Sequence, residues 1–166
     1  QTQDWHPKEH WSFASSYKDK EPFATTELNY SEQVLWPDHC VQQTKGADFH
    51  PDLDTQPTQL FIRKGFRKSI DSYSAFYEND HETPTGLTGY LDKRNIDTLY
   101  VTGLATDFCV KWSVLDGMKE GFSVYVVEDA IRGIDVNGSL KQALDEMKKA
   151  GAKFITSDKI QGTIEA

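Results

Sequence analysis

The pattern of apolar and polar residues is most regular in the second half of the chain. A β-branched and aromatic run at residues 98–102 predicts a buried strand that ends at Gly103. From Cys109 onward, apolar residues recur at four-residue spacing as far as Gly121, which predicts a helix closed by that glycine. The cysteine therefore lies near the start of a helix that directly follows a strand.

The alternation of strand and helix patterns continues toward the end of the chain. Residues 122–127 predict a second strand, and residues 153–156 predict a third. Between them, Ser139 and Gln142 form a capping-box pattern at the start of a helix that ends at Gly151. Alternation at this spacing is typical of right-handed crossover units, so the sequence predicts an α/β fold whose largely parallel sheet carries helices on its faces.

The first half of the chain shows little periodicity. Residues 6–57 are rich in Pro, Ser, Thr, Asp and aromatic residues, and we expect long loops that build a functional site. Residues 59–62 predict one short strand with Lys64 just past its carboxyl end, where parallel sheets bind ligands. Residues 87–91 predict a short helix. No repeat or linker marks a boundary, so we expect a single domain over residues 1–166.

Composition and charge narrow the classes of partner. The 166 residues include 37% hydrophobic residues, enough to fill the core of one domain. A net charge of -8 argues against nucleic acid or an anionic membrane as a partner, whereas a small neutral molecule would not feel that field. No apolar run approaches the roughly 18 residues of a membrane span. Because the sequence opens at Gln1 without a methionine, we expect a segment before it.

Two cysteines, Cys40 and Cys109, do not suggest a disulfide scaffold, so we expect thiols in a cytoplasmic protein. Cys109 is a candidate nucleophile, because a thiol at a helix start sees the positive end of the helix dipole, which favours the thiolate. The same turn could offer backbone N–H groups to an oxyanion. On the residues alone, a cysteine that is simply buried remains an equal alternative.

Lys64 could lower the pKa of a nearby thiol, although a solvated lysine is the simpler alternative. Asp4, His6 and His39 offer one carboxylate and two imidazoles, a ligand set that leaves positions open for water or substrate on a Zn²⁺-like or Fe²⁺-like ion. His10 could be a fourth ligand or a neighbour of the ligands. Chance scatter of the five histidines is the alternative explanation.

Aromatic side chains crowd the same loops and could form either a core or the walls of a pocket for a flat heteroaromatic ligand. They are Trp5, Trp11, Phe13 and Trp36.

Seven segments together carry a resemblance to a known family. They are residues 2–7, 12–15, 35–41, 46–50, 63–65, 71–76 and 103–110. In this order, and over nearly the whole chain, they resemble the nicotinamidases (pyrazinamidases) of the isochorismatase-like family of cysteine hydrolases. The resemblance implies the three-layer α/β/α fold of that family, with a largely parallel sheet.

The resemblance also implies a reaction and its catalytic residues. Similar proteins hydrolyse nicotinamide to nicotinate and ammonia through a cysteine thioester, in NAD salvage. By the matching motifs, Cys109 would be the nucleophile and Lys64 the activating cation. The oxyanion hole would use the backbone amides of Ala105 and Cys109, with a cis peptide between Leu104 and Ala105.

For the binding residues, the resemblance implies a divalent metal that positions the pyridine nitrogen. Its ligands would be Asp4, His6 and His39, and zinc is the first expectation, with iron and manganese also compatible. Trp36 would line the ring pocket, with Phe13 and Tyr73 as further candidates. A homo-oligomer is compatible with the sequence.

The sequence departs from the family at one point. In the family, a catalytic aspartate ends the first strand, before the metal motif, and no residue here matches it. We therefore expect the first strand and this general base to be absent from residues 1–166, which leaves the activity of this chain open. The alternatives are a related hydrolase of another small amide or carbamoyl compound, and a non-catalytic relative that only binds a ligand. The full Asp-His-His set favours a nicotinamidase.

Overall fold

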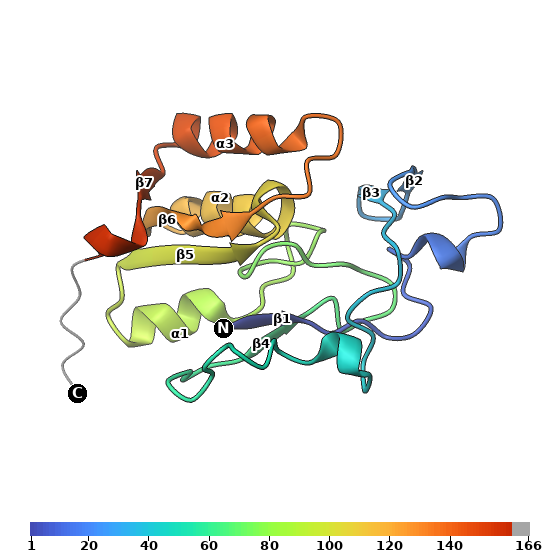
Figure 1. Ribbon diagram of the computed structural model, residues 1–166, viewed down its shortest axis with the longest axis horizontal. Helices are drawn as coiled ribbons and strands as arrows, with labels where there is room; N and C mark the ends of the chain where they lie inside the picture. Colours follow the sequence, from blue (N-terminus) through green and yellow to red (C-terminus); the bar gives the residue numbers. More distant parts are fainter. Residues whose placement is uncertain (161–166) are drawn as a thin grey trace. The chain divides into compact units, whose positions relative to one another are not determined.

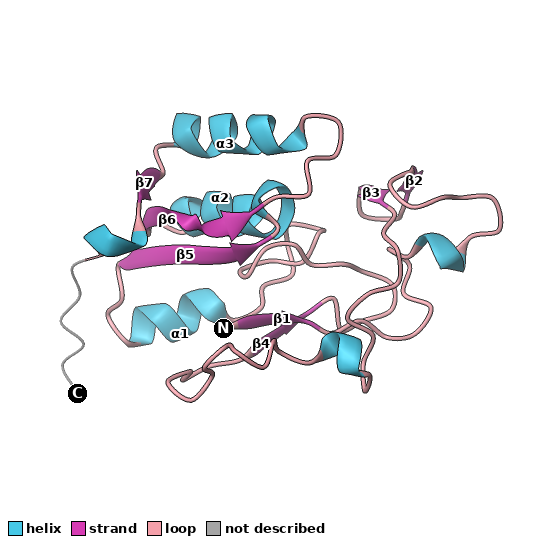
Figure 2. Ribbon diagram, viewed as in Figure 1, coloured by secondary structure: helices cyan, strands magenta, loops and turns pink. Residues whose placement is uncertain are grey.

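The computed structural model describes residues 1–160, which belong to two compact units. The first unit is Gln1–Leu87, and the second begins at Thr88. The ribbon in Figure 1 follows the chain by colour, and Figure 2 shows that regular helices and long strands are concentrated in the second unit.

The second unit contains a parallel three-stranded sheet. Its strands are β5 (Thr98–Leu104), β6 (Ser123–Arg132) and β7 (Lys153–Ile155), in the order β5-β6-β7. Runs of β-branched residues predicted these strands. Two of these residues on β6, Val126 and Val127, are buried in the structure. The predicted parallel sheet is thus confirmed, although β5 and β6 extend beyond the predicted ends.

Three helices accompany this sheet. They are α1 (Leu87–Lys93), α2 (Lys111–Lys119) and α3 (Ser139–Ala150). In Figure 1, α1 lies on one side of β5, and α2 and α3 lie on the other side. Helix α2 buries Val114, and α3 buries Met147, so the predicted apolar stripes are the faces that pack. The α/β alternation predicted from the sequence is confirmed.

The predicted capping box at the start of α3 is wrong. The N-cap residue is Gly138, which has no side chain to cap the helix, and Ser139 is already inside the helix. The hydroxyl of Ser139 donates to Asp107 instead, and the amide of Gln142 donates to Glu146. The hydroxyl of Ser139, which the local pattern predicted to cap the helix, therefore binds a residue distant in sequence.

The first unit contains two short strand pairs. Strand β1 (Thr2–Asp4) pairs in parallel with β4 (Ile62–Lys64), and β2 (Thr25–Glu27) pairs antiparallel with β3 (Glu32–Val34). The strand predicted at residues 59–62 is therefore shifted, because β4 exists only where β1 supplies hydrogen bonds. As a result, Lys64 is the last residue of β4 rather than the residue beyond its end.

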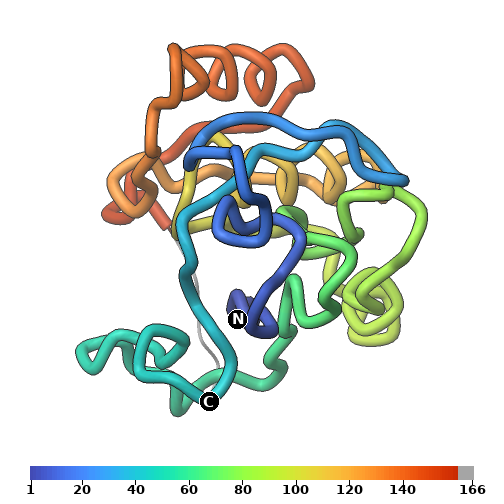
Figure 3. Tube along the Cα trace, turned by 90° about the vertical axis from the view of Figure 1, so that its right-hand side faces the viewer, coloured from blue at the N-terminus to red at the C-terminus, as the bar shows by residue number. Residues whose placement is uncertain are grey.

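Loops make up most of the first unit, as predicted. Figure 3 shows these segments, blue to green, winding without long regular elements. Their core mixes the apolar Phe13 and Leu35 with polar residues that are also buried, among them His6, His10 and Asp71. Buried polar groups need partners, so hydrogen bonds have a large share in holding this unit together.

Within residues 1–160, no helix has both the length and the apolar character that crossing a bilayer requires.

Candidate active site

Cys109 lies in a tight turn between β5 and α2. After β5 ends, the peptide bond between Leu104 and Ala105 is cis, as the resemblance predicted. Residues Thr106–Val110 then form a π-helical turn, closed by the N–H of Val110 donating to the carbonyl of Ala105 at 3.0 Å. Helix α2 begins at Lys111, so the half-buried Cys109 stands two residues before it.

This position has a chemical consequence for the thiol. The N–H groups at a helix start carry partial positive charge, and Cys109 lies in the π-helical turn that leads directly into α2. In general, the positive end of a helix dipole favours the thiolate of a nearby cysteine, which is the nucleophilic form. Single-turn π-helices are rare and often occur at functional sites.

Asp107 is a buried carboxylate in the same turn. It accepts hydrogen bonds from the hydroxyl of Ser139, from the N–H of Ile134 at 3.1 Å and from the N–H of Asp135 at 2.8 Å. Burial raises the pKa of Asp107, but these hydrogen bonds lower it by more, so the pKa lies below its ordinary value. The sequence suggested no role for Asp107 beyond ordinary turn chemistry.

Lys64 is a buried cation in the first unit. Because Asp4 and Lys64 are register partners in the β1–β4 pair, Nζ of Lys64 lies 2.9 Å from Oδ1 of Asp4. Nζ also donates to the carbonyl oxygens of Ser72 at 3.2 Å and Tyr73 at 3.1 Å. Lys64 is therefore not a solvated surface lysine but a positive charge held in a fixed place.

The imidazole of His6 lies beside two other histidines. Its ring centroid is 4.7 Å from that of His39 and 4.8 Å from that of His10. Backbone pairing brings them together, because the N–H of His6 donates to the carbonyl of Cys40. The Nε2 atom of His6 lies 3.3 Å from Oδ1 of Asp71, and Nδ1 lies 3.3 Å from the carbonyl oxygen of His39. Both ring nitrogens thus face oxygen acceptors.

Asp71 is the fully buried partner of His6. It also accepts from the N–H of Ser72 at 2.7 Å and from Nε2 of Gln33 at 3.4 Å. Burial lowers the pKa of His6, but the hydrogen bond and charge of Asp71 raise it by more. Likewise, burial raises the pKa of Asp71, and His6 holds it below its usual range. The sequence placed Asp71 in a matching motif without giving it a role.

The sequence also suggested no role for Gly65, although it lies in a matching segment. It has a φ of +59°, and a Cβ atom added there would lie 2.5 Å from Nε2 of His6 and 3.1 Å from Oδ1 of Asp71. No real Cβ atom fits at the first of these distances. The glycine that follows Lys64 therefore allows the His6–Asp71 pair to pack against the end of β4.

The donors of the predicted metal site fit a divalent ion chemically, but they are not arranged around one. Oδ1 of Asp4 is buried and makes no hydrogen bond, yet it faces Lys64 in an ion pair. His6 is engaged by Asp71, and Nδ1 of His39 lies 2.8 Å from the carbonyl of Pro37. Within residues 1–160, no three His, Cys, Asp or Glu side chains form a group that could hold an ion.

Two other residues near the predicted ligands are His10 and Cys40. Nδ1 of His10 lies 2.7 Å from the hydroxyl of Ser12, and Nε2 lies 3.1 Å from the carbonyl of Ile70. Burial lowers the pKa of His10. For Cys40, burial and the charge of Asp4 raise the pKa of the thiol, which makes it a poorer nucleophile. Both cysteines are thiols, as predicted.

The three predicted ring-binding residues gather in the first unit. Nε1 of Trp36 donates to the hydroxyl of Tyr73 at 3.0 Å, and the backbone of Trp36 forms a parallel bridge with Phe13. The ring of Phe13 lies 5.5 Å from that of His39. The aromatic cluster therefore adjoins the histidines.

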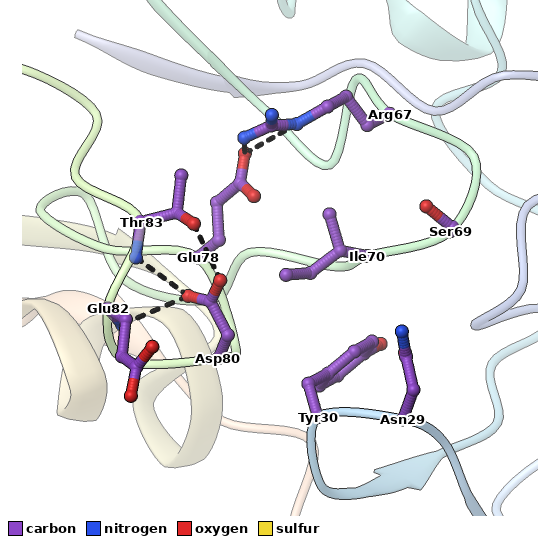
Figure 4. Close-up of a pocket in the computed structure, with 9 residues that line it drawn as sticks. All are labelled: Asn29, Tyr30, Arg67, Ser69, Ile70, Glu78, Asp80, Glu82 and Thr83. Carbon is purple, nitrogen blue, oxygen red and sulfur yellow. Dashed lines mark hydrogen bonds and ion pairs between the residues drawn. The ribbon is translucent and has the colours of Figure 1, made fainter.

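A pocket of about 480 Å³ in the first unit is separate from these residues. Arg67 and Glu78 form an ion pair at the edge of this pocket (Figure 4). The Nη2 atom of Arg67 lies 2.5 Å from Oε1 of Glu78. Asp80 accepts hydrogen bonds from the backbone of Glu82 and Thr83 and so shapes the neighbouring loop. None of the predicted site residues lines this pocket.

Comparison with known proteins defines the class of this chain. A family model described as Isochorismatase domain matches residues 12–159, which is most of the chain. The matched residues include the parallel sheet and the cysteine turn after β5.

Relatives within this class narrow the assignment. A nicotinamidase of Acinetobacter baylyi is 55% identical over 96% of this chain and 74% of its own length. A solved nicotinamidase/pyrazinamidase structure from Acinetobacter baumannii is 58% identical, covers 96% of this chain and 77% of that chain, and has a TM-score of 0.94. The chain therefore belongs to the nicotinamidase branch of the isochorismatase family.

Two further solved structures contain ligands. A protein from L. infantum in complex with nicotinate is 38% identical, covers 95% of this chain and 70% of that chain, and has a TM-score of 0.80. A pyrazinamidase from Pyrococcus horikoshii in complex with zinc is 33% identical, covers 93% of this chain and 73% of that chain, and has a TM-score of 0.71.

Proposed function

We propose that this protein hydrolyses nicotinamide to nicotinate and ammonia, with pyrazinamide as an alternative substrate, and that it serves NAD salvage in the cytoplasm. The main support for this proposal is the turn at Cys109. There a thiol follows a cis peptide bond at the end of a parallel strand and precedes a helix. The 55% identity with a nicotinamidase supports the choice of substrate. Two thiols without a disulfide fit a reducing compartment.

The proposed reaction has two halves that share one covalent intermediate. In the first, Sγ of Cys109 bonds to the carboxamide carbon, while the C=O electron pair moves to oxygen and the thiol proton passes to a general base. The carbonyl then re-forms, the C–N bond breaks, and the protonated nitrogen leaves as ammonia. In the second, water attacks the thioester, the C–S bond breaks, and nicotinate leaves as the thiol is restored.

Charge in this reaction develops on sulfur and on the carbonyl oxygen. We assign the backbone amides of Ala105 and Cys109 to the oxyanion, following the family motif. Following the same family motif, we assign Lys64 as the activating cation; within the first unit its ammonium group is buried and fixed by Asp4 and by the carbonyls of Ser72 and Tyr73. In the family, the general base is an aspartate that no residue of this sequence matches.

The ring of the substrate would lie against Trp36, with Tyr73 and Phe13 beside it. What supports this assignment is the aromatic cluster itself, in which Trp36 and Tyr73 are hydrogen-bonded and Phe13 contacts His39. Aromatic walls suit a flat heterocycle, and binding there would remove both faces of the ring from water.

A divalent metal, with zinc as the first choice, would be held by Asp4, His6 and His39. When bound, it would supply a Lewis-acidic contact for the pyridine nitrogen. The donor types, the adjacent imidazoles and the zinc in the P. horikoshii protein support this proposal. Loading would require one ring nitrogen of His6, which faces Asp71 or the carbonyl of His39, to face the ion instead.

Ammonia release from nicotinamide tests the proposed function directly. We expect Cys109→Ala to lose turnover by about a thousandfold or more, because no thioester can form, while its metal content stays that of the parent. A parent protein that releases no ammonia from nicotinamide but does so from another small amide would contradict the assigned substrate. Equal turnover in Cys109→Ala would contradict the assigned nucleophile and direct attention to Cys40.

Metal analysis tests the ligand assignment separately. We expect His39→Ala to bind zinc about 10- to 100-fold more weakly and to raise the KM for nicotinamide. His50→Ala is a matched control, since His50 is an exposed loop histidine whose nearest charged partner is Asp52 at 3.8 Å. Equal zinc content in both variants would contradict the proposed ligand set.

A further inference from the structure

The carboxylate of Asp107 joins the cysteine turn to a distant segment of the second unit. We infer that Asp107 is a positioning residue for Cys109. Its carboxylate anchors the turn that carries Cys109 to the start of α3. This inference rests on the proposed role of Cys109 as the nucleophile. It assigns a task to a residue that the sequence suggested was part of an ordinary turn.

Three hydrogen bonds of Asp107 come from one short segment far along the chain. The N–H of Ile134 donates to Oδ1, and the N–H of Asp135 and the hydroxyl of Ser139 donate to Oδ2. These donors lie 27, 28 and 32 residues beyond Asp107 in sequence. Since Asp107 is only 1% exposed, water does not compete for the carboxylate, and the contacts are strong ones.

The same segment passes close to the carboxylate because of Gly133. A Cβ atom at that position would lie 3.3 Å from Oδ1 of Asp107 and 2.7 Å from Cδ1 of Leu140. Gly133 therefore lets the loop before α3 approach the turn. Without this approach, the N–H groups of Ile134 and Asp135 would not reach Asp107.

Helix α3 makes the negative charge of Asp107 tolerable beside a cysteine. A bare carboxylate near Cys109 would disfavour the thiolate by like-charge repulsion. Here the carboxylate lies at the positive end of a 12-residue helix whose N-cap, Gly138, has no side chain. The helix start and the three donors offset the charge, so Asp107 can hold the turn at little electrostatic cost to the thiol.

Cys109 depends on this anchor because its own turn is short. The Thr106–Val110 turn is closed at its base by hydrogen bonds to the carbonyl of Ala105. Asp107, the second residue of this turn, ties it to the segment before α3. Together they determine where Sγ and the backbone N–H of Cys109 point relative to the end of β5. A displacement of about 1 Å at a reacting group can cost roughly 100-fold in rate.

The test compares variants of the anchor with an exposed carboxylate elsewhere in the second unit that is also bound by a serine. The anchor variants are Asp107→Asn, Ser139→Ala and Ser139→Thr, of which the last keeps the hydroxyl. The control is Asp129→Asn, because Asp129 also accepts from a serine, through the N–H and hydroxyl of Ser157. For each full-length variant, kcat and KM for nicotinamide, Tm, and the pH profile of Cys109 alkylation by iodoacetamide are measured.

We expect Asp107→Asn to lower kcat by about 10- to 100-fold with little change in KM, because the reacting sulfur is displaced and the ring site is not. Ser139→Ala should lower kcat less. It should also move the midpoint of the alkylation profile to higher pH, because the carboxylate loses a donor and its charge then opposes the thiolate more strongly. Ser139→Thr should restore both values, and Asp129→Asn should leave both at the parent level.

Loss of Tm in Asp107→Asn with parental kcat and a parental alkylation profile would overturn the inference, since Asp107 would then only stabilise α3. If Asp107→Asn does not fold, Ser139→Ala and Ser139→Thr decide, and equal kcat and equal profiles in these two would overturn it. Alkylation needs no substrate. A parent protein without nicotinamide hydrolysis would therefore refute the proposed function, while the alkylation profiles would still support or overturn the role of Asp107.

Discussion

The two units hold their candidate residues in different ways. In the second unit, a strand, a turn and a helix carry Cys109, and one carboxylate adds a tertiary anchor. In the first unit, regular structure is sparse, and buried charges do the positioning. Lys64 is held by Asp4, and His6 by Asp71, which lies 65 residues away in sequence. The first unit should therefore be the more sensitive to loss of a single polar group.

Removal of Asp71 should show this difference most strongly. We expect Asp71→Ala to lower the free energy of unfolding by about 3–5 kcal/mol, because His6 would lose the counter-charge that holds it in the interior. Asp145→Ala is the control, since its ion pair with Lys141 is exposed and should contribute little. Urea unfolding of both variants gives the comparison. Similar losses in the two would contradict the view that buried charges hold the first unit.

A methyl group at Gly65 should have the next largest effect. We expect Gly65→Ala to lower the free energy of unfolding by roughly 2–4 kcal/mol, because it adds overpacking against His6 to the cost of a side chain at positive φ. Gly86→Ala separates the two causes, since Gly86 has a φ of +93° and open space around its Cβ position. That variant should lose only about 1–2 kcal/mol, the cost of the backbone conformation. Equal losses would remove His6 from the explanation.

The smallest effect should come from protonation of Asp107 in the second unit. Its pKa is lowered in the folded protein, so its contribution to stability is present above its unfolded pKa of about 3.9 and is lost as the pH falls through the folded pKa. We expect the unfolding free energy of Asp107→Asn to fall less steeply with acid below pH 4 than that of the parent. Urea unfolding between pH 6 and pH 3 measures both slopes. Parallel slopes would show that Asp107 contributes no such stability.

The second unit was largely predictable because its signals are local. The apolar spacing after Cys109 and the valine-rich run of β6 predict their elements without knowledge of any partner. The error at Ser139 has the opposite origin, since its hydroxyl is used by Asp107, 32 residues earlier in sequence. A capping pattern considers only residues close in sequence, so it cannot predict such a partner. The same limit explains why β6 extends to Arg132, where β5 supplies the pairing.

The first unit was predictable only in outline. Its loops follow from composition, but the start of β4 depends on pairing with β1, and the His6–Asp71 pair joins residues that no periodicity relates. Motif resemblance supplied what local patterns could not, including the cis peptide before Ala105, which the structure confirms. The roles of Cys109 and Lys64 rest on that resemblance and stay predictions.

Tyr73 uses separate atoms for two contacts, and this separation bears on how such an enzyme could change its substrate. The carbonyl oxygen of Tyr73 holds Lys64, while its phenol hydroxyl contacts Trp36 in the aromatic cluster. A carbonyl persists through any side-chain replacement. Descendants of this protein could therefore reshape the ring-binding surface at position 73 and inherit the buried cation intact, so that new specificity could evolve without rebuilding the catalytic machinery.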